Sequence, residues 1–564
     1  MGTTADKLLY LQGTKSAIKD AIVAKGVDVP VGTTFRDYAT KIGSITTGST
    51  GSETADTWVR PTEWLALPNN VDGVQKVSIL NAVFDTDSEF VAFTCIGAYT
   101  VDWGDGTVEN FAENIKAEHK YTYNDVDLNS DTVAAFGYKQ CIITITPQAG
   151  NNLTIINLNV DHSSIGTSTS YDLTTGFLDM RINSLNCTVL YLGAVASNFV
   201  KHTMLEQCLI GELADISLDN LFYDCYSLQS VTIKDTSSVT SFTNMHNNNY
   251  SLQKMPTYTF RSAGASITNM FYNCYSLRET YPLVVTLSNA YALQSMFYGC
   301  KSLTYIDITI VSDINYTLGA VFQSCSSLED IKISFTGTGK VTSLSSTFQS
   351  TRIKSSPVID TSLCTNFSNT FQYCDRLTDL YEYNYTSATT LSQMLDSCYS
   401  LKSVPNFNIT ASCTNLGYLC NNCWSLEKAP TFSNSSGVTN IVAMLQYCKS
   451  ITTIPSYVFG NIAGNFNSAF AYMDSLQVMP NITAGSVYTA NSNFIANNYS
   501  LKRMLMPLRF TFSVANAKMS ATALNEMYSI LPTVTGQTVT VTGNYGTTSD
   551  DPTIATAKGW TVTG

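Results

Sequence analysis

Apolar and polar positions recur in a constant order through the middle of the chain, from Leu221 to Leu501. One copy reads Asn269-Met-Phe-Tyr-Asn-Cys-Tyr-Ser-Leu277, and we call the place of its cysteine the anchor. Neighbouring anchors are 23 to 26 residues apart, at Cys225, Asn249, Cys274, Cys300, Cys325, Thr351, Cys374, Cys398, Cys423, Cys448, Met473 and Asn498. This period predicts a solenoid of the leucine-rich-repeat kind, in which each unit buries its apolar face by stacking on its neighbours.

The positions around the anchor predict the shape of each unit. The residue three before the anchor is usually Phe or Leu, and a Leu or Ile three after it begins a short apolar stretch with strand character. Proline often follows, as at Pro256 and Pro405, where the loss of an N–H donor is tolerated. Strands about 4.8 Å apart in each of the repeats predict a rod about 60 Å long.

The pattern before the repeats predicts two smaller modules. Residues 4–45 are typical of a helical hairpin, and residues 46–57, rich in Gly, Ser and Thr, predict a flexible linker. β-Branched and aromatic runs at 77–84, 90–95, 99–103 and 141–145 predict a β-sandwich. Further runs at 153–160, 177–182 and 188–192 predict irregular strands that lead into the array.

The C-terminal residues predict a cap, because the last unit of a stack needs shielding. A helix is expected at 521–531, a strand at 538–542 and a short helix at 553–558. The expected fold is therefore multi-domain and mainly β with short helices. Its parts are a helical anchor at 1–45, the linker at 46–57, an Ig-like β-sandwich at 58–149, the solenoid at 150–515 and the cap at 516–564.

Composition narrows the classes of partner. Charged residues make up 13% of the chain and hydrophobic residues 44%, with a net charge of −12. A polar surface built from so few charges must use Ser, Thr, Asn, Gln and Tyr, which suits contacts with neutral polar partners such as glycans; a stable extracellular or virion surface is the alternative explanation. The negative balance argues against binding of a phosphate backbone.

Most of the 15 cysteines occupy the anchor, so adjacent turns are expected to stack them in a column of small buried thiols. Local, even pairing as in a disulfide framework is not evident. Cys420 and Cys423 have CxxC spacing, but no second such pair accompanies them, so a zinc or redox site is not expected.

Targeting signals are not expected in this chain. Its first residues lack the charged and apolar regions of a secretory signal, and no run reaches the 18 or so apolar residues of a membrane span. We expect a protein that is soluble when made and that leaves the cell, if at all, by another route.

The stretch Asp102-Trp-Gly-Asp-Gly106, followed by His119-Lys-Tyr-Thr-Tyr123, resembles PKD-type immunoglobulin-like sandwiches. Asp102 and Asp105 are weak candidates for a calcium site or a carboxylate pair. Asp that binds its own backbone in a turn is the more common explanation, and no metal or other cofactor is expected.

The repeat resembles BspA-type leucine-rich repeats, whose MFxxCxxLxxI signature is matched by Met296-Phe-Tyr-Gly-Cys-Lys-Ser-Leu-Thr-Tyr-Ile306. Such repeats imply a role in bacterial surface adhesion or in bacteriophage structural proteins. Residues 9–26 and 34–43 look like the short leader of phage virion proteins, and residues 554–562 are similar to phage fibre-like proteins that carry these repeats. The resemblance therefore implies a virion protein, with 1–45 as its anchor through Leu8, Leu11, Ile18, Ile22, Phe35, Tyr38 and Ile42.

The position just after the anchor varies most and supplies the candidate receptor-binding residues. Aromatic residues hold it at Tyr226, Tyr250, Tyr275, Tyr399, Trp424 and Tyr499. An aromatic ring beside Ser and Asn offers a flat apolar face for a sugar. The alternative is that these rings lie against the next turn and only stiffen the stack.

We therefore expect a phage fibre or appendage that joins other virion proteins through residues 1–45, presents the solenoid to a host-surface glycan or protein, and forms a homo-oligomer. It would be assembled in the host cytoplasm and act on the particle surface, without nucleic-acid binding or membrane insertion. The alternatives are an architectural capsid, neck or tail protein without receptor contact, and a bacterial surface adhesin. An enzyme is not expected, since no nucleophile motif or recurring carboxylate pair accompanies the four histidines.

Overall fold

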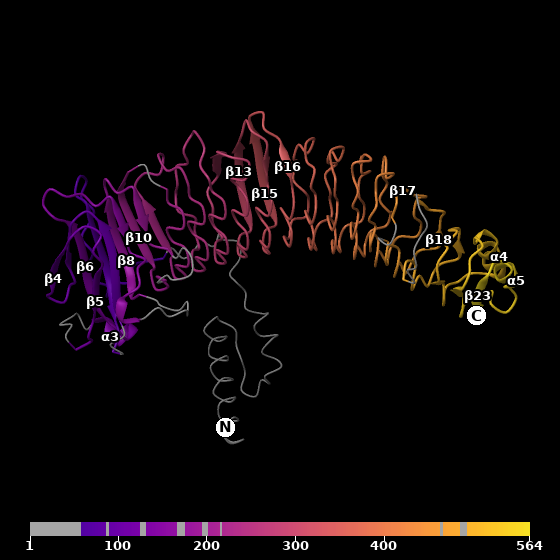
Figure 1. The fold of residues 1–564 in the computed structure, drawn as a ribbon, viewed down its shortest axis with the longest axis horizontal. Helices are drawn as coiled ribbons and strands as arrows, with labels where there is room; N and C mark the ends of the chain where they lie inside the picture. Colours follow the sequence, from indigo (N-terminus) through magenta and orange to yellow (C-terminus); the bar gives the residue numbers. More distant parts are fainter. Residues whose placement is uncertain are drawn as a thin grey trace, which may run out of the picture. The chain divides into compact units, whose positions relative to one another are not determined.

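The computed structural model describes residues 58–85, 89–124, 131–165, 175–193, 201–214, 217–462, 466–484 and 493–564. Residues Trp58–Gly564 form one compact unit, in which successive turns follow one another in a row (Figure 1). The predicted helical anchor at 1–45, with all seven of its candidate residues, and the predicted linker lie outside the described residues. Among the helices of the described ranges, none has both the length and the apolar character that a membrane crossing requires.

The N-terminal part of this unit is built from two sheets, whose alternating apolar residues face a common core. Its elements are β1 (Lys76–Val83), β2 (Phe90–Ile96), β3 (Tyr99–Asp102), β4 (Val108–Phe111), β5 (Ala117–Lys120), α3 (Asp131–Phe136), β6 (Lys139–Pro147), β7 (Ile155–Asn157), η1 (Ser163–Ile165), β8 (Phe177–Ser184), β9 (Val189–Tyr191), β10 (Gln207–Leu213) and β11 (Ser230–Ile233). One sheet has the order β11-β10-β8-β1-β6-β3-β4 and the other β5-β2-β7-β9. The strands expected from the apolar runs are present within a few residues of their predicted bounds.

Both sheets change from antiparallel to parallel pairing as the chain enters the solenoid. Strand β1 pairs antiparallel with β6 and β8, whereas β8 pairs parallel with β10, and β10 with β11. In the second sheet β2 pairs antiparallel with β7, and β7 parallel with β9. Strands β8 and β9 follow residue 149, so the predicted sandwich and the solenoid share their sheets and one hydrophobic core.

Each of the units with anchors from Cys225 to Met473 contains two residues with left-handed backbone, one five before the anchor and one directly before it. In the unit of Cys274 these are Asn269, with φ 54°, and Asn273, with φ 58°. Asn and Ser are the most frequent residues at these positions, and Asn tolerates this conformation better than most residues that carry a Cβ. Backbone N–H groups then donate along the stack, from Asn269 to the Gln294 carbonyl at 3.0 Å and from Asn273 to the Tyr298 carbonyl at 2.7 Å. The left-handed positions therefore accompany a backbone ladder between consecutive units.

Inside the solenoid, equivalent side chains of successive units form columns. Three places before the anchor, aromatic rings stack nearly parallel with centroids 5.3 to 6.0 Å apart, in the order Phe222, His246, Phe271, Phe297, Phe322, Phe348 and Phe371. Burial of these rings supplies part of the apolar surface that each unit hides from water.

The anchor side chain is a hydrogen-bond donor to the preceding unit. The Cys325 thiol donates to the Phe297 carbonyl at 3.0 Å, and the Cys300 thiol to the Phe271 carbonyl at 3.1 Å. Asn249 replaces cysteine with an amide that donates to the Phe222 carbonyl at 2.6 Å. The predicted column of buried thiols is confirmed. Asn can replace Cys at position 249 because its amide reaches the same kind of carbonyl in the preceding unit.

Regular strands after the anchor are fewer than the repeat pattern predicts. The strands of this region are β12 (Leu283–Thr286), β13 (Tyr305–Val311), β14 (Tyr316–Thr317), β15 (Asp330–Thr336), β16 (Val341–Ser343), β17 (Val458–Phe459), β18 (Val478–Met479), β19 (Thr483–Ala484), β20 (Arg503–Met504) and β21 (Phe512–Ser513). The two seven-residue strands, β13 and β15, lie in units without proline in that segment. Elsewhere Pro405, Pro430 and Pro455 remove a ladder donor, and single bridges such as Phe407 to Phe432 replace a strand pair.

The C-terminal segment contains the expected helices and strands, α4 (Ala521–Ile530), β22 (Gln537–Thr540), α5 (Thr553–Thr556) and β23 (Trp560–Thr563). Ser520 caps α4 by accepting from the N–H of Ala523. Strands β21, β22 and β23 are parallel and in sequence order, as in a solenoid. Asn544, preceded by Gly543 at φ 79°, donates to the Val514 carbonyl at 2.8 Å, so the anchor pattern continues into this segment.

Candidate binding surface

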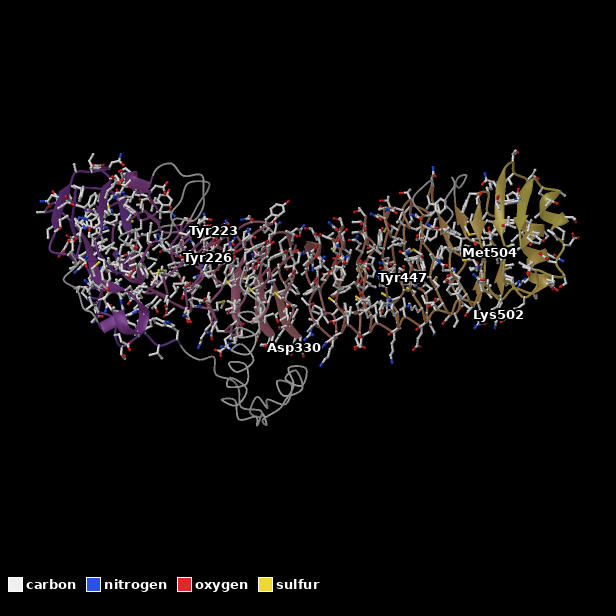
Figure 2. All side chains as sticks on the ribbon, turned by 90° about the horizontal axis from the view of Figure 1, so that it is seen from below. Tyr223, Tyr226, Asp330, Tyr447, Lys502 and Met504 are labelled. Atoms are coloured by element: carbon white, nitrogen blue, oxygen red, sulfur yellow. The ribbon has the colours of Figure 1, made fainter. Side chains whose placement is uncertain are left out.

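The outward positions of the units carry a row of aromatic side chains that we call the tyrosine ridge. These outward positions lie five, two and one before the anchor and one after it. The residues four and three before the anchor, and the anchor itself, are buried. The ridge consists of Tyr223, Tyr226, Tyr250, Tyr272, Tyr275, Tyr298, Tyr373, Tyr399, Tyr418, Trp424, Tyr447, Tyr472 and Tyr499. Tyr223, Tyr226 and Tyr447 mark it in two separate parts of the solenoid (Figure 2).

The first part of the ridge is a closed stack. The rings of Tyr226 and Tyr250 have centroids 4.8 Å apart and are inclined by 10°, and those of Tyr250 and Tyr275 are 4.8 Å apart and inclined by 2°. Both faces of the Tyr250 ring are therefore covered, and all three side chains are half-buried. Partial burial, followed by the neighbouring phenols, raises the pKa of Tyr250. These three rings offer their edges and hydroxyl groups rather than a flat face.

Lysines close both ends of this stack. The Lys301 ammonium lies 4.1 Å from the centroid of the Tyr275 ring, a favourable cation–π position. At the other end the Lys201 ammonium donates to the Tyr226 hydroxyl at 2.9 Å and lies 3.2 Å from the Asp224 carboxylate. Burial lowers the pKa of Lys201, but the bonds to Tyr226 and Asp224 raise it more, so this ammonium stays charged.

A second column runs beside the first, two places before the anchor. The rings of Tyr272 and Tyr298 stack with centroids 4.4 Å apart and an inclination of 3°. Tyr223 occupies the same place in the unit of Cys225, and burial, followed by Asp224 and Tyr226, raises its pKa. Six tyrosines from four units thus form one patch.

An amide ladder continues this second column beyond the six tyrosines. Gln323 Nε2 donates to Gln349 Oε1 at 2.6 Å, and Gln372 Nε2 donates to Asp396 Oδ2 at 2.8 Å. The Asp396 carboxylate also accepts from Asn421 Nδ2 at 2.9 Å, and the residue is buried. The Asp396 carboxylate thus accepts from an uncharged amide of the unit before it and of the unit after it, which links three units side by side.

The second part of the ridge is more open. Tyr373 is 51% exposed, Trp424 47% and Tyr499 46%. The Trp424 ring is inclined by 51° to that of Tyr399, and the Lys449 ammonium lies 5.3 Å from its centroid. Flat, accessible ring surface is therefore concentrated in the C-terminal half of the ridge.

The structure divides the six residues expected from sequence between two roles. Tyr226, Tyr250, Tyr275 and Tyr399 are half-buried against neighbouring rings, whereas Trp424 and Tyr499 are exposed. Seven ridge residues were missed, namely Tyr223, Tyr272, Tyr298, Tyr373, Tyr418, Tyr447 and Tyr472. The sequence signal for these residues is a tyrosine five, two or one before the anchor, which becomes visible when the repeats are aligned on the anchor.

Asp102 and Asp105, the weak metal candidates, are turn residues. Asp102 Oδ1 accepts from the Gly104 N–H at 3.0 Å, and Asp105 Oδ1 accepts from the Thr107 N–H at 2.9 Å. Asp105 Oδ2 lies 2.7 Å from His119 Nε2. Gly104 has φ 78°, and a Cβ there would lie 2.5 Å from the Ile142 carbonyl oxygen, so the turn requires glycine. Within the described ranges, no three His, Cys, Asp or Glu side chains are grouped to hold a metal ion.

Two histidines are part of the solenoid core. His246 Nδ1 lies 2.7 Å from Asn249 Oδ1 and Nε2 lies 2.6 Å from the Tyr258 hydroxyl, while the ring stacks between Phe222 and Phe271. Burial lowers the pKa of His246 to about 4, and burial likewise lowers the pKa of His202 to about 4. Both rings are therefore neutral near pH 7 and serve packing.

Comparison with known proteins finds distant relatives of the repeat region. Residues 214–309, 316–433 and 365–480 match a family described as "Mycoplasma protein of unknown function, DUF285", which covers less than half of the chain. A search of curated proteins finds no match.

Two solved structures of leucine-rich-repeat proteins are similar over most of the chain. A leucine rich cell surface protein from Faecalibacterium prausnitzii A2-165 is 14% identical, with 71% of this chain and 97% of that chain covered and a TM-score of 0.30. A leucine-rich repeat protein from Bacteroides ovatus ATCC 8483 is 13% identical, with 64% and 91% covered and a TM-score of 0.29. These likenesses are too distant to transfer a function.

Proposed function

We propose that this protein is an adhesion protein whose solenoid binds a surface partner through the tyrosine ridge, without catalysing a reaction. The observation that carries the proposal is the ridge itself, thirteen aromatic side chains at four outward positions of the solenoid units. A solitary exposed ring needs no explanation, but a row of aromatic side chains is typical of a binding surface.

The chemistry of the ridge suits recognition. Tyrosine and tryptophan contribute large, rigid and amphipathic contact area at low conformational cost, and Ser and Asn beside them supply adaptable hydrogen bonds. Trp424 and Tyr499 offer ring faces, while Tyr226, Tyr250 and Tyr275 offer hydroxyl groups on a stacked, preorganised support. Preorganisation lowers the entropy lost on binding.

The partner that fits this surface is polar and nearly uncharged, such as a glycan or a surface protein. Lys201 is already paired with Asp224, and the whole chain carries a net charge of −12. A nucleic acid, which requires clustered free cations, does not fit. The proposal includes no membrane insertion and no cofactor.

We propose that this adhesion protein is part of a phage particle and joins other virion proteins through residues 1–45. The PKD-like segment 58–149 would serve as a spacer, and the assembled form would be a homo-oligomer. The leader-like residues 9–26 and the ending at 554–562 support this setting. A bacterial cell surface is an equally suitable setting for the ridge. An architectural virion protein without receptor contact is the alternative, and the adsorption experiment below tests it.

The ridge can be tested without disturbing the fold. We expect the combined substitutions Tyr373→Ser, Tyr418→Ser, Trp424→Ser and Tyr499→Ser to lower adsorption of the purified protein to intact bacterial cells at least tenfold. Serine already occupies these places in other units, for example Ser350, Ser346 and Ser326, so the variant should fold. Adsorption is measured by cell pull-down over a panel of species, together with a printed array of surface polysaccharides.

The matched control changes exposed tyrosines outside the ridge. Tyr291 is 63% and Tyr545 73% exposed, and Tyr291→Ser with Tyr545→Ser should leave adsorption unchanged. Equal adsorption by wild type and ridge variant would rule out the ridge as the binding surface. Adsorption of the wild type to no cell or polysaccharide would favour the architectural alternative.

A further inference from the structure

A cavity of about 360 Å³ lies between two consecutive units, away from the tyrosine ridge. One wall is the loop 431–436, which follows the anchor Cys423, and the other is 455–458, which follows the anchor Cys448. The volume is at the lower end of the range for ligand pockets, about 300–1,000 Å³. Such a cavity suits one or two sugar units rather than an extended ligand.

Part of the cavity lining is apolar and rigid. The Phe432 ring packs against Tyr457 with centroids 5.5 Å apart and against Phe407 at 5.8 Å. The Tyr457 hydroxyl donates to the Pro430 carbonyl at 2.7 Å, which fixes its ring. Val458, 56% exposed, adds a further apolar group. Together these groups offer a surface for the C–H face of a sugar ring.

Several hydroxyl groups of the lining are used internally and hold the walls. Thr431 Oγ1 donates to Asn406 Oδ1 at 2.7 Å, and Ser435 Oγ donates to the Val458 carbonyl at 2.6 Å. The second of these bonds joins the two loops that form the cavity. The shape of the cavity therefore depends on the stacking of these two units.

Three exposed polar groups of the lining keep hydrogen-bonding capacity. Asn434 Oδ1 accepts from the Ser436 N–H at 3.0 Å and from Ser436 Oγ at 2.7 Å, which orients the amide and leaves its NH₂ group available. Ser433 Oγ accepts from Asn406 Nδ2 at 3.0 Å and retains its own O–H. The Ser456 hydroxyl also lines the cavity. Oriented donors beside apolar side chains match the alternating C–H and O–H groups of a pyranose.

None of the side chains that line this cavity is charged. A carboxylate, sulfate or phosphate placed here would lose hydration without gaining a counterion, which is unfavourable. Neutral sugars carry no such cost. From the lining, its free donors and its charge, we propose that this cavity binds a neutral hexose unit of a glycan.

This inference is independent of the ridge, because ridge and cavity share no residue. The test uses the full chain and the methyl glycosides of glucose, galactose, mannose and N-acetylglucosamine, with glucuronate as the charged comparison. Binding is followed by saturation-transfer NMR and by titration. We expect at least one neutral glycoside to bind and glucuronate to bind at least tenfold more weakly.

Two variants locate the site. Val458→Trp fills the cavity and should lower affinity at least tenfold, as should Asn434→Asp, which keeps the acceptor for Ser436 and removes the free NH₂ group. The matched control is Val358→Trp, a valine that is 63% exposed in another unit, and it should bind like wild type. Thermal unfolding confirms that each variant is folded.

Three results would overturn the assignment: no neutral glycoside binding at tens of millimolar, unchanged binding by folded Val458→Trp, or equal binding of glucuronate. None of them depends on adsorption to cells, so failure of this site and failure of the ridge are distinguishable.

Discussion

At the scale of single residues, the anchor shows how one chemical requirement admits several side chains. The Phe297 carbonyl accepts both from the Cys300 N–H, at 3.1 Å, and from the Cys325 thiol of the next unit, at 3.0 Å. Cysteine and asparagine both reach such a carbonyl, and both are buried. Burial raises the pKa of Cys325 to about 12, so this thiol is an inert packing group.

His246 gives the solenoid a pH dependence whose sign follows from its burial. Its pKa is about 4 in the folded protein and near 6.5 when exposed. Stability is therefore greatest above pH 6.5 and is lost as the pH falls towards 4, by about 3 kcal/mol for this residue. We expect the melting temperature of wild type to fall more steeply over that range than that of His246→Phe.

Comparing how steeply the melting temperatures of wild type and His246→Phe change with pH separates the effect of His246 from that of other buried groups. Burial raises the pKa of Glu89 to about 8, with a smaller opposing effect of the Gly176 N–H, so that this carboxyl stabilises the fold below pH 4.5 and loses its contribution as the pH rises through 8. The contribution of Glu89 is the same in wild type and in His246→Phe, so it cancels when the two pH dependences are compared. Parallel curves for the two proteins would contradict the lowered pKa of His246.

At the scale of the repeated unit, the left-handed positions are the most demanding feature. A residue with a Cβ costs about 1–2 kcal/mol in this conformation, and a β-branched residue more. Ser324 has φ 62°. We expect Ser324→Val to lower the free energy of unfolding by about 2 kcal/mol and Ser324→Gly to leave it unchanged or raise it, as measured by denaturant unfolding.

Ser326, two residues along and exposed, is the matched control for this position. It does not have positive φ, and Ser326→Val should change stability by less than about 0.5 kcal/mol. Equal destabilisation by valine at both sites would show that the backbone conformation is not the cause.

Unit by unit, the strand pattern was predicted where the apolar run is long and uninterrupted. The runs at 77–84 and 177–182 became β1 and β8, and the segment after Cys300 became β13. The run after Cys398 did not, because Pro405 removes a donor from the ladder. Alternation and β-branching are local signals, whereas strand pairing also depends on the neighbouring unit.

At the scale of the whole molecule, Trp58–Gly564 is one compact unit whose core runs from Val77 to Trp560. We expect a protein that lacks residues 1–57 to keep the melting temperature of the full chain, since each repeat is stabilised by its neighbours in that unit. If residues 1–45 are the anchor, the same truncation should no longer join virions, as measured by its copy number in purified particles.

The results of this truncation experiment distinguish the phage particle from the bacterial cell surface as the location of the protein. Incorporation at normal copy number would contradict the anchor. Absence of even the full chain from particles, with recovery in the bacterial cell envelope, would identify the cell-surface setting. A melting temperature lowered by several degrees would show that residues 1–57 contribute to the stability of the compact unit.

Sequence alone was sufficient for the repeat, its period, the buried columns three before, at and three after the anchor, and the order of helices and strands in the C-terminal segment. These features depend on residues close together in the chain. The stacked structure was needed to show which tyrosine faces are covered, that the anchor cysteines donate to the preceding unit, and that loops after Cys423 and Cys448 line a cavity. Each of these depends on groups about 25 residues apart, whose juxtaposition exists only once consecutive units have stacked in register.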